Sequence, residues 1–90
     1  MAWRIEVSET AEKQLAKLDR PVAQRIRSFL RERVSVLEDP RSIGDALKGS
    51  ELAEFWKYRV GDYRIICKIE DNILRVLVVM AGHRREVYER

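Results

Sequence analysis

The first residues of the chain alternate between apolar and charged side chains. Trp3, Ile5 and Val7 are separated by Arg4 and Glu6. This period of two is typical of a strand with one buried face, because successive side chains point to opposite sides of a sheet. The alternation therefore predicts a strand over residues 3–7.

Two stretches with helical periodicity follow this strand. The apolar positions of the first are Ala11, Leu15 and Leu18, and those of the second are Val22, Ile26, Phe29, Leu30, Val34 and Leu37. Ser8 or Thr10 can cap the first helix, and the second restarts at Pro21 with Asp19 as a candidate cap. We expect two antiparallel helices that cover one face of a sheet.

The chain changes character after the second helix. Asp39-Pro40 ends that helix, since the residue before a proline is pushed out of the α region. We interpret residues 41–50, which are rich in glycine and serine, as a loop anchored by Ala46-Leu47. Residues 51–54 fit either a loop or the start of a strand.

Residues 55–69 form two strand-like runs that meet at Gly61-Asp62. Glycine supplies the positive φ of a two-residue hairpin turn, so this segment predicts a hairpin. Such a turn places Arg59 opposite Arg64, with Lys57 on the same face. Like charges directly opposite each other destabilise a sheet, so stability gives no reason for this arrangement. A polyanion bound to that face would give one, and the alternative is that the three side chains simply splay into water.

A turn at residues 70–72 leads into the apolar run of residues 73–80, which predicts a central strand. Ala81-Gly82 is expected to interrupt this strand before the basic tail, residues 83–90. The predicted order is β-α-α-β-β-β in one domain, residues 1–90. The expected fold class is α+β, with two N-terminal helices on a mainly antiparallel sheet.

The distribution of charge points to an anionic partner. The net charge is +3, and residues 1–54 contain ten basic and ten acidic residues, against eight basic and five acidic in residues 55–90. The excess therefore belongs entirely to the C-terminal strands and tail. The charged residues from Arg25 to Arg33 lie mostly off the apolar stripe of their helix. We interpret them as solvated, with nucleic-acid contact as the alternative.

Several classes of protein are disfavoured by what the chain contains. Cys67 is the only cysteine, inside an apolar strand, where a buried reduced thiol is expected. His83 is the only histidine, so we expect no metal site and no cofactor. The N-terminus has no apolar segment like that of a signal peptide, and no run approaches the ~18 apolar residues of a membrane span. We expect a cytoplasmic protein without membrane contact.

Three segments, taken with their order and separation, carry a resemblance to a known family. They are Leu47-Lys48-Gly49, Arg59-Val60-Gly61-Asp62-Tyr63-Arg64-Ile65 and Gly82-His83-Arg84-Arg85-Glu86-Val87-Tyr88. Over essentially its whole length the chain resembles the RelE toxins of bacterial type II toxin–antitoxin modules, within the RelE/ParE superfamily. The resemblance implies an mRNA interferase, which is a metal-independent endoribonuclease that cleaves mRNA in the ribosomal A site and inhibits translation under stress.

The resemblance also implies where the chemistry lies. The catalytic positions carried over are Lys57, Arg64, Arg84 and Tyr88, and the RNA-binding candidates are Arg59, His83, Arg85 and Lys48. One position departs from the family, because its best-known members have a lysine where this chain has Phe55. The chain also stops two residues after Tyr88, without the C-terminal extension of some relatives.

The residues fit RNA cleavage by the 2′-OH, which needs cations for the phosphate, a base and an acid. An unperturbed tyrosine has a pKa near ~10, which neighbouring cations would lower, so Tyr88 becomes a plausible base among arginines. Glu86 and His83 are rival bases. Lys57 or His83 is the better candidate for the acid, since Arg84 is a poor proton donor and is expected to bind the phosphate.

Two other functions fit the same fold. One is a ParE-like inhibitor of DNA gyrase, and the other is a catalytically silent member that only binds its antitoxin and operator DNA. All three functions imply an acidic, RelB-like antitoxin that covers the basic face. The nuclease version adds the ribosome and mRNA as partners, with operator DNA reached only through the antitoxin.

Overall fold

The computed structural model describes residues 2–47 and 55–87. Its strands are β1 (Arg4–Val7), β2 (Asp45–Ala46), β3 (Phe55–Val60), β4 (Tyr63–Glu70) and β5 (Arg75–His83). Its longer helices are α1 (Glu9–Ala16) and α2 (Arg20–Ser28), the latter continued by the π-helical segment η1 (Phe29–Val34). The short helices are η2 (Pro40–Ser42), η4 (Asp71–Ile73) and α3 (Arg84–Val87). None of the described helices is long and apolar enough to cross a membrane.

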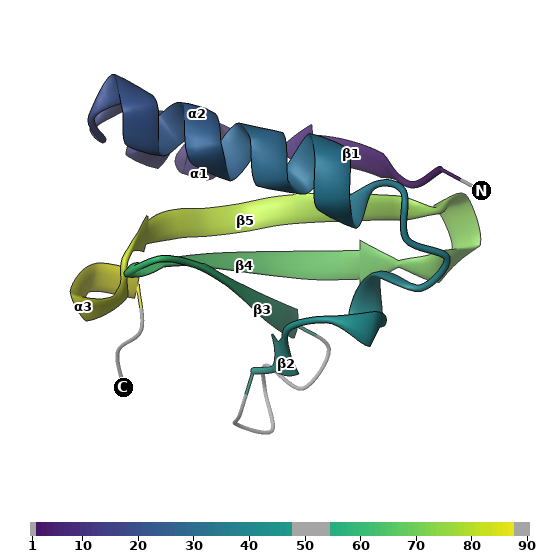
Figure 1. Cartoon of the computed structure of the whole chain (residues 1–90). Coiled ribbons are helices and arrows are strands. Elements are labelled where there is room, and N and C mark those ends of the chain that lie inside the picture. The colour runs from purple at the N-terminus through teal and green to yellow at the C-terminus, as the bar shows by residue number, and fades with distance from the viewer. Residues whose placement is uncertain (1, 48–54, 88–90) are drawn as a thin grey trace.

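The five strands form one sheet in the order β1-β5-β4-β3-β2. β1 runs parallel to β5, and the other neighbouring strands are antiparallel. The helices α1 and α2 lie together on one side of this sheet (Figure 1). The α+β fold with two helices on a mainly antiparallel sheet is therefore confirmed, including the central position of β5.

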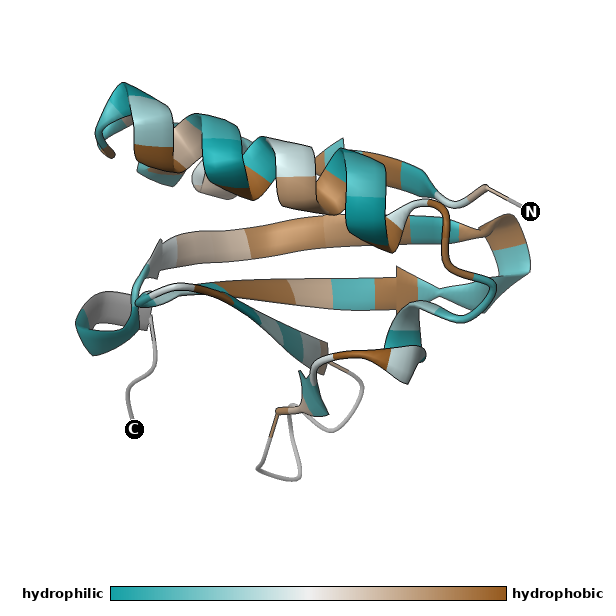
Figure 2. Ribbon diagram, viewed as in Figure 1, coloured by the Kyte–Doolittle hydropathy of each residue, from teal (hydrophilic) through white to brown (hydrophobic). Residues whose placement is uncertain are grey.

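The core lies between these helices and the sheet. Figure 2 shows the apolar parts of the helices turned toward the strands. The buried residues at this interface include Ala11, Leu15, Ile26, Leu30, Val34, Tyr58, Ile65, Cys67, Val76 and Val78. Cys67 is a buried free thiol, as expected, and burial raises its pKa. The alternation in β1 is also confirmed, because Trp3 is buried while Arg4 is exposed.

The two helices begin as expected but differ from the prediction further along. Ser8 caps α1 by accepting a hydrogen bond from the amide of Ala11 at 3.1 Å. The expected cap by Asp19 is wrong in part, because Asp19 occupies the cap position of α2 but its side chain accepts no capping bond. After Ser28 the helix widens to a π-helix, in which the amide of Ser35 donates to the carbonyl of Leu30 at 3.0 Å. The apolar stripe stays buried on one side despite this change.

Two strand boundaries differ from the sequence-based expectation. Residues 41–50 were expected to form a loop, but Asp45–Ala46 pairs with β3 as the short edge strand β2. The expected interruption at Ala81-Gly82 is also wrong, because β5 continues through both residues to His83. Ala81 pairs with Ile65 and Gly82 with Arg64, so pairing with β4 overrides the weak strand propensity of these two residues.

Three aromatic side chains fix the segment between η1 and β2. The indole of Trp3 donates to the carbonyl of Glu38 at 3.2 Å, and the indole of Trp56 donates to that of Ile43 at 2.7 Å. The buried hydroxyl of Tyr58 donates to the carbonyl of Pro40 at 2.6 Å, and burial raises the pKa of this phenol. These bonds hold the segment against the edge of the sheet and so keep β3 in place.

Ion pairs connect elements at the end of the sheet away from the β3–β4 turn. Arg41 contacts Asp71 at 2.9 Å and lowers the pKa of that carboxyl. Arg75 bridges Glu6, at 2.9 Å, and Glu70, whose pKa it lowers. Arg41 and Arg75 therefore already have carboxylate partners within the chain.

Candidate functional site

Lys57, Arg59 and Arg64 lie on the face of the sheet that α1 and α2 leave uncovered. Arg59 pairs directly with Arg64 across the β3–β4 hairpin, and Val60 pairs with Tyr63 at its turn, as the sequence predicted. Tyr58, between Lys57 and Arg59, is buried against the helices, so alternation sends its two neighbours to the opposite face. We call this surface the basic face.

Arg64 is buried although it is charged. Its exposed fraction is only 9%, and its guanidinium makes one long hydrogen bond, from Nη1 to the carbonyl of Tyr63 at 3.4 Å. Within the described residues, nothing accepts a hydrogen bond from its Nε. A buried donor without a partner costs about 1–3 kcal/mol, more when it is charged. An anion bound at this position would remove that cost.

Lys68 is a further cation on the basic face that the sequence analysis did not identify. It lies four residues beyond Arg64 on β4, so both side chains project from the same side of the sheet. Its partner across the hairpin is Phe55, the position where the resemblance expects a lysine. Alternation along β4 places residues 64, 66 and 68 on one face, so the sequence alone could have identified Lys68 as part of the basic face.

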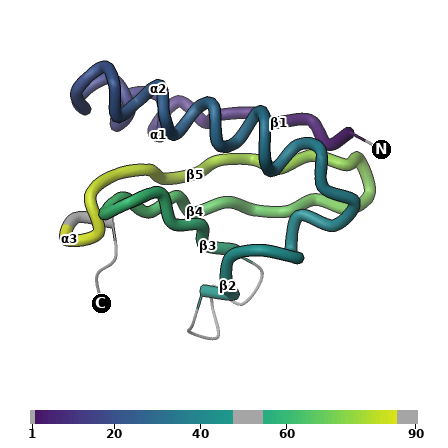
Figure 3. Tube along the Cα trace, in the orientation of Figure 1, coloured from purple at the N-terminus to yellow at the C-terminus, as the bar shows by residue number. Residues whose placement is uncertain are grey.

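The tail returns to the tip of the hairpin. The amide of Arg84 donates to the carbonyl of Asp62 at 2.9 Å, which joins the start of α3 to the β3–β4 turn. Figure 3 shows α3 beside this turn, at the end of β5. The expectation that the tail folds back beside the hairpin is therefore confirmed for His83 and Arg84. Arg84 and Arg85 both have exposed side chains there.

His83 is not brought beside Arg64. Its ring packs edge-on against Tyr63, with centroids 5.5 Å apart, and its Nδ1 accepts a hydrogen bond from the amide of Arg85 at 3.2 Å. Because Gly82 pairs with Arg64, alternation directs His83 to the opposite side of β5. Lys48 and Tyr88 lie outside the described residues, so the geometry of those two candidates stays a prediction.

The cationic side chains of the basic face can neutralise a phosphate in different ways. Arg64 offers a preformed fork of donors in a dry setting, where an ionic hydrogen bond is strong. Lys57, Arg59 and Lys68 add positive charge along the same face, and Arg84 adds it at the turn. The geometry therefore suits an extended anion that follows the hairpin from Lys68 toward its tip.

Comparison with known proteins places the chain in a family. The family model of the ParE toxin of type II toxin–antitoxin systems, parDE, matches residues 5–88. The chain belongs to the RelE/ParE superfamily of type II toxins. This toxin is 32% identical over 90 residues to the mRNA interferase toxin RelE of Escherichia coli, covering 98% of this chain and 92% of that protein.

Two mycobacterial comparisons agree with this assignment. The toxin is 28% identical over 90 residues to Toxin RelG of Mycobacterium tuberculosis, with both chains fully covered. Its fold matches a chain of the toxin–antitoxin complex RelBE2 from the same organism with a TM-score of 0.84. That match has 26% identity and covers 96% of this chain and 95% of the other. The family that the sequence motifs indicated is thus confirmed.

Proposed function

We propose that this toxin is a ribosome-dependent endoribonuclease that cleaves mRNA in the ribosomal A site. The observation that carries the proposal is the buried guanidinium of Arg64, whose Nε lacks an acceptor among the described residues. A scissile phosphate supplies the missing acceptor, and its charge grows in the transition state, where such donors act most strongly. The similarity to an mRNA interferase supports the same reading.

The roles divide according to position. Arg64 holds the scissile phosphate, while Arg59 and Arg84 bind the backbone that passes the tip of the hairpin. Lys57 faces the same phosphate and donates a proton to the departing 5′-oxygen, because His83 points to the other side of β5. Tyr88 removes the proton from the 2′-OH, which then attacks phosphorus and leaves a cyclic phosphate. Lys48 and Arg85 contact RNA outside the cleaved bond.

Lys68 takes the place of the lysine that is missing at residue 55. Directly paired residues have Cβ atoms about 4.5–5.5 Å apart, which a lysine side chain spans easily. The ammonium of Lys68 therefore reaches the space above Phe55 on the basic face.

Moving this lysine across the hairpin tests its role. Lys68→Met should lower the rate of cleavage about tenfold to a hundredfold, in proportion to one lost ionic contact with the transition state. Adding Phe55→Lys to that variant should restore most of the rate, since the ammonium returns to the same space. Single-turnover cleavage of mRNA on purified ribosomes measures both. A double variant as slow as Lys68→Met would show that Lys68 acts elsewhere.

A type II toxin also needs an antitoxin, and we propose an acidic, RelB-like protein that covers the basic face. A related toxin is found in a toxin–antitoxin complex, which supports this partner. Operator DNA is reached through the antitoxin. The charge of +3 predicts association that slows as salt rises.

Mapping mRNA 5′ ends after incubation with programmed ribosomes tests the proposed activity. The expected result is cleavage within the A-site codon, lost in Arg84→Ala and kept in Arg31→Ala, whose side chain is exposed away from the basic face. The alternative target is DNA gyrase, as the resemblance to the ParE branch implies. Intact mRNA together with trapped gyrase–DNA complexes would replace the nuclease by that alternative.

A further inference from the structure

The basic face has an apolar half beside its cations. Its charged side chains come from β3 and β4, whereas the β5 side of the same face is apolar. Met80 pairs with Ile66, and Leu77 pairs with Lys68, so these side chains share the face of the cations. We call Ile66, Leu77 and Met80 the apolar strip.

A β-bulge turns Met80 toward the basic face. The register between β4 and β5 shifts at this point, so that Val79 is an extra residue in β5. In strict alternation with the buried Val78, Met80 would be buried against the helices as well. Instead Met80 is 42% exposed, and the next residue, Ala81, is buried in its place. Bulges are common next to active sites, where they re-aim a side chain.

The apolar strip lies one nucleotide's width from the proposed phosphate site. Arg64 pairs with Gly82, two residues beyond Met80 on β5, so Met80 is the diagonal neighbour of Arg64. Diagonal neighbours across two strands are about 7–8 Å apart, a gap that long side chains bridge. A phosphate held by Arg64 is separated from its base by one ribose. That base can therefore lie over Met80 while the phosphate stays on Arg64.

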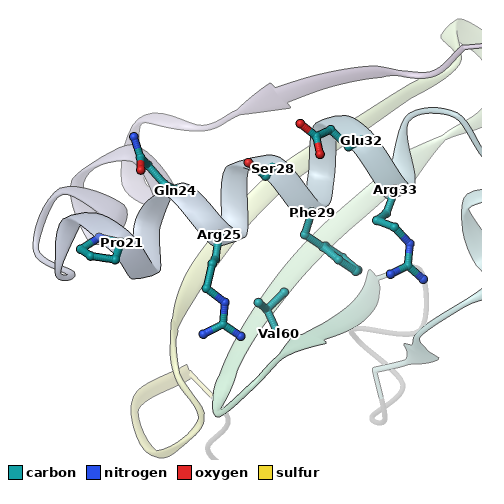
Figure 4. A pocket seen from close by; sticks show the side chains of 8 residues that line it. All are labelled: Pro21, Gln24, Arg25, Ser28, Phe29, Glu32, Arg33 and Val60. Carbon is teal, nitrogen blue, oxygen red and sulfur yellow. The ribbon is translucent and has the colours of Figure 1, made fainter.

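The helix side of the hairpin cannot receive the same base. Phe29 and Val60 lie there in a hollow of about 570 Å³ between α2 and β3, with Arg25 and Arg33 beside them (Figure 4). This hollow is on the other side of the sheet from Arg64. A nucleotide whose phosphate is bound by Arg64 therefore has the apolar strip, and not the hollow, within reach of its base.

We propose that the apolar strip is a stacking surface for one base of the mRNA, with Met80 in contact with its face. The base belongs to a nucleotide that adjoins the scissile phosphate, so the inference rests on the proposed nuclease function. The polarisable sulfur of methionine makes favourable contacts with aromatic rings. The side chains of the strip offer no strong hydrogen-bonding group to a base edge. Contact with the face of a base is sequence-tolerant, so the strip holds the RNA without selecting one base.

Removing the side chain and removing the base test one contact from both sides. Met80→Ala should lower kcat/KM for cleavage on programmed ribosomes about two- to tenfold. An mRNA with an abasic ribonucleotide on one side of the cleaved bond should lose a similar factor with the unchanged toxin. On that mRNA, Met80→Ala should cause no further loss, because the contact is already absent. The two flanking nucleotides are made abasic in turn, which identifies the stacked base.

The matched control is Ile73→Ala, which removes an exposed apolar side chain from η4, in the turn that joins β4 to β5. It should leave both the cleavage rate and the loss on base removal unchanged. Losses from Met80→Ala and from base removal that simply multiply, at each of the two nucleotides, would overturn the inference. They would mean that Met80 only covers Ile66.

A binding measurement separates the stacking surface from the nuclease. The chain has two methionines, so labelling with [¹³C-methyl]methionine gives two signals, which Met80→Ala assigns. A single-stranded RNA with 2′-O-methyl riboses, which cannot be cleaved, should move the Met80 signal upfield through the ring current of the stacked base. An abasic oligomer of the same charge should leave it in place. A Met80 signal that the RNA does not move would overturn the inference, whether or not the amides of Lys57 and Arg64 respond.

Two further outcomes have definite meanings. An upfield shift by the RNA without mRNA cleavage on ribosomes would reject the proposed nuclease and support the base-stacking surface. A peptide of alternating glutamate and leucine that moves the Met80 signal when RNA does not would assign the apolar strip to a polypeptide partner, and the inference would fail.

Discussion

Replacing Arg64 by methionine is expected to slow cleavage by about two to three orders of magnitude and at the same time to stabilise the protein. Arg64 is 9% exposed, its Nε has no acceptor among the described residues, and it lies opposite Arg59. Methionine keeps an unbranched apolar chain that ends where Nε of the arginine lies, without the charge. It therefore removes a desolvation cost and a repulsion in the free toxin, together with the donors that bind the phosphate.

Both effects can be given a size. Loss of one preorganised donor to a developing charge lowers kcat by about 10²–10³-fold. Removal of an unpaired buried donor should raise the free energy of unfolding by about 1 kcal/mol, which corresponds to a rise in Tm of roughly 4–8 °C for a domain of this size. Cleavage on programmed ribosomes and thermal unfolding of the same preparation measure the two effects.

The control is Arg31→Met, which removes an exposed arginine from η1 and should change neither quantity appreciably. Arg64→Lys keeps the charge but loses the fork, so its cleavage rate should fall between those of the other two proteins. A methionine variant that unfolds at a lower temperature would mean that Arg64 serves packing. One that still cleaves mRNA would remove the basis for the proposed mechanism.

The position of Arg64 opposite Arg59 could be predicted from the sequence of the hairpin alone. A two-residue turn fixes the register of both strands, so Gly61-Asp62 was enough to place Arg59 opposite Arg64. The same register placed Lys68 opposite Phe55. Local chemistry therefore determined most of the basic face, whereas the burial of Arg64 depends on tertiary packing and could not be predicted from the pattern of the strand.

The features that sequence analysis missed depend on contacts between distant residues. The strand β2 has only two residues, too few for any periodicity, and exists because Asp45 and Ala46 pair with β3. The strand β5 continues through Gly82 because β4 lies beside it. By contrast, Arg25, Arg31 and Arg33 on the helix were expected to be solvated, and their side chains are exposed.

Gly44 is the backbone position on which the edge of the sheet depends most. Its φ is +84°, in the region that side chains rarely adopt. A Cβ there would lie 2.6 Å from the carbonyl oxygen of Lys57, 2.7 Å from Nε1 of Trp56 and 2.9 Å from Cδ1 of Tyr58. Two of these neighbours are held in place, because Trp56 and Tyr58 donate hydrogen bonds to Ile43 and Pro40. A Cβ at this position would therefore clash with β3.

Gly44→Ala is expected to lower the free energy of unfolding by about 2–5 kcal/mol, which combines the cost of a left-handed residue with that of overpacking. The matched control is Gly61→Ala, at φ +60°, where the nearest atom is the mobile tip of Arg25 at 3.4 Å. In that variant only the conformational cost applies, so the free energy of unfolding should fall by about 1–2 kcal/mol. Urea unfolding of the three proteins, followed by tryptophan fluorescence, measures the difference. Equal losses in both variants would show that the segment before β2 yields to the added methyl group, and that the aromatic hydrogen bonds do not fix it against β3.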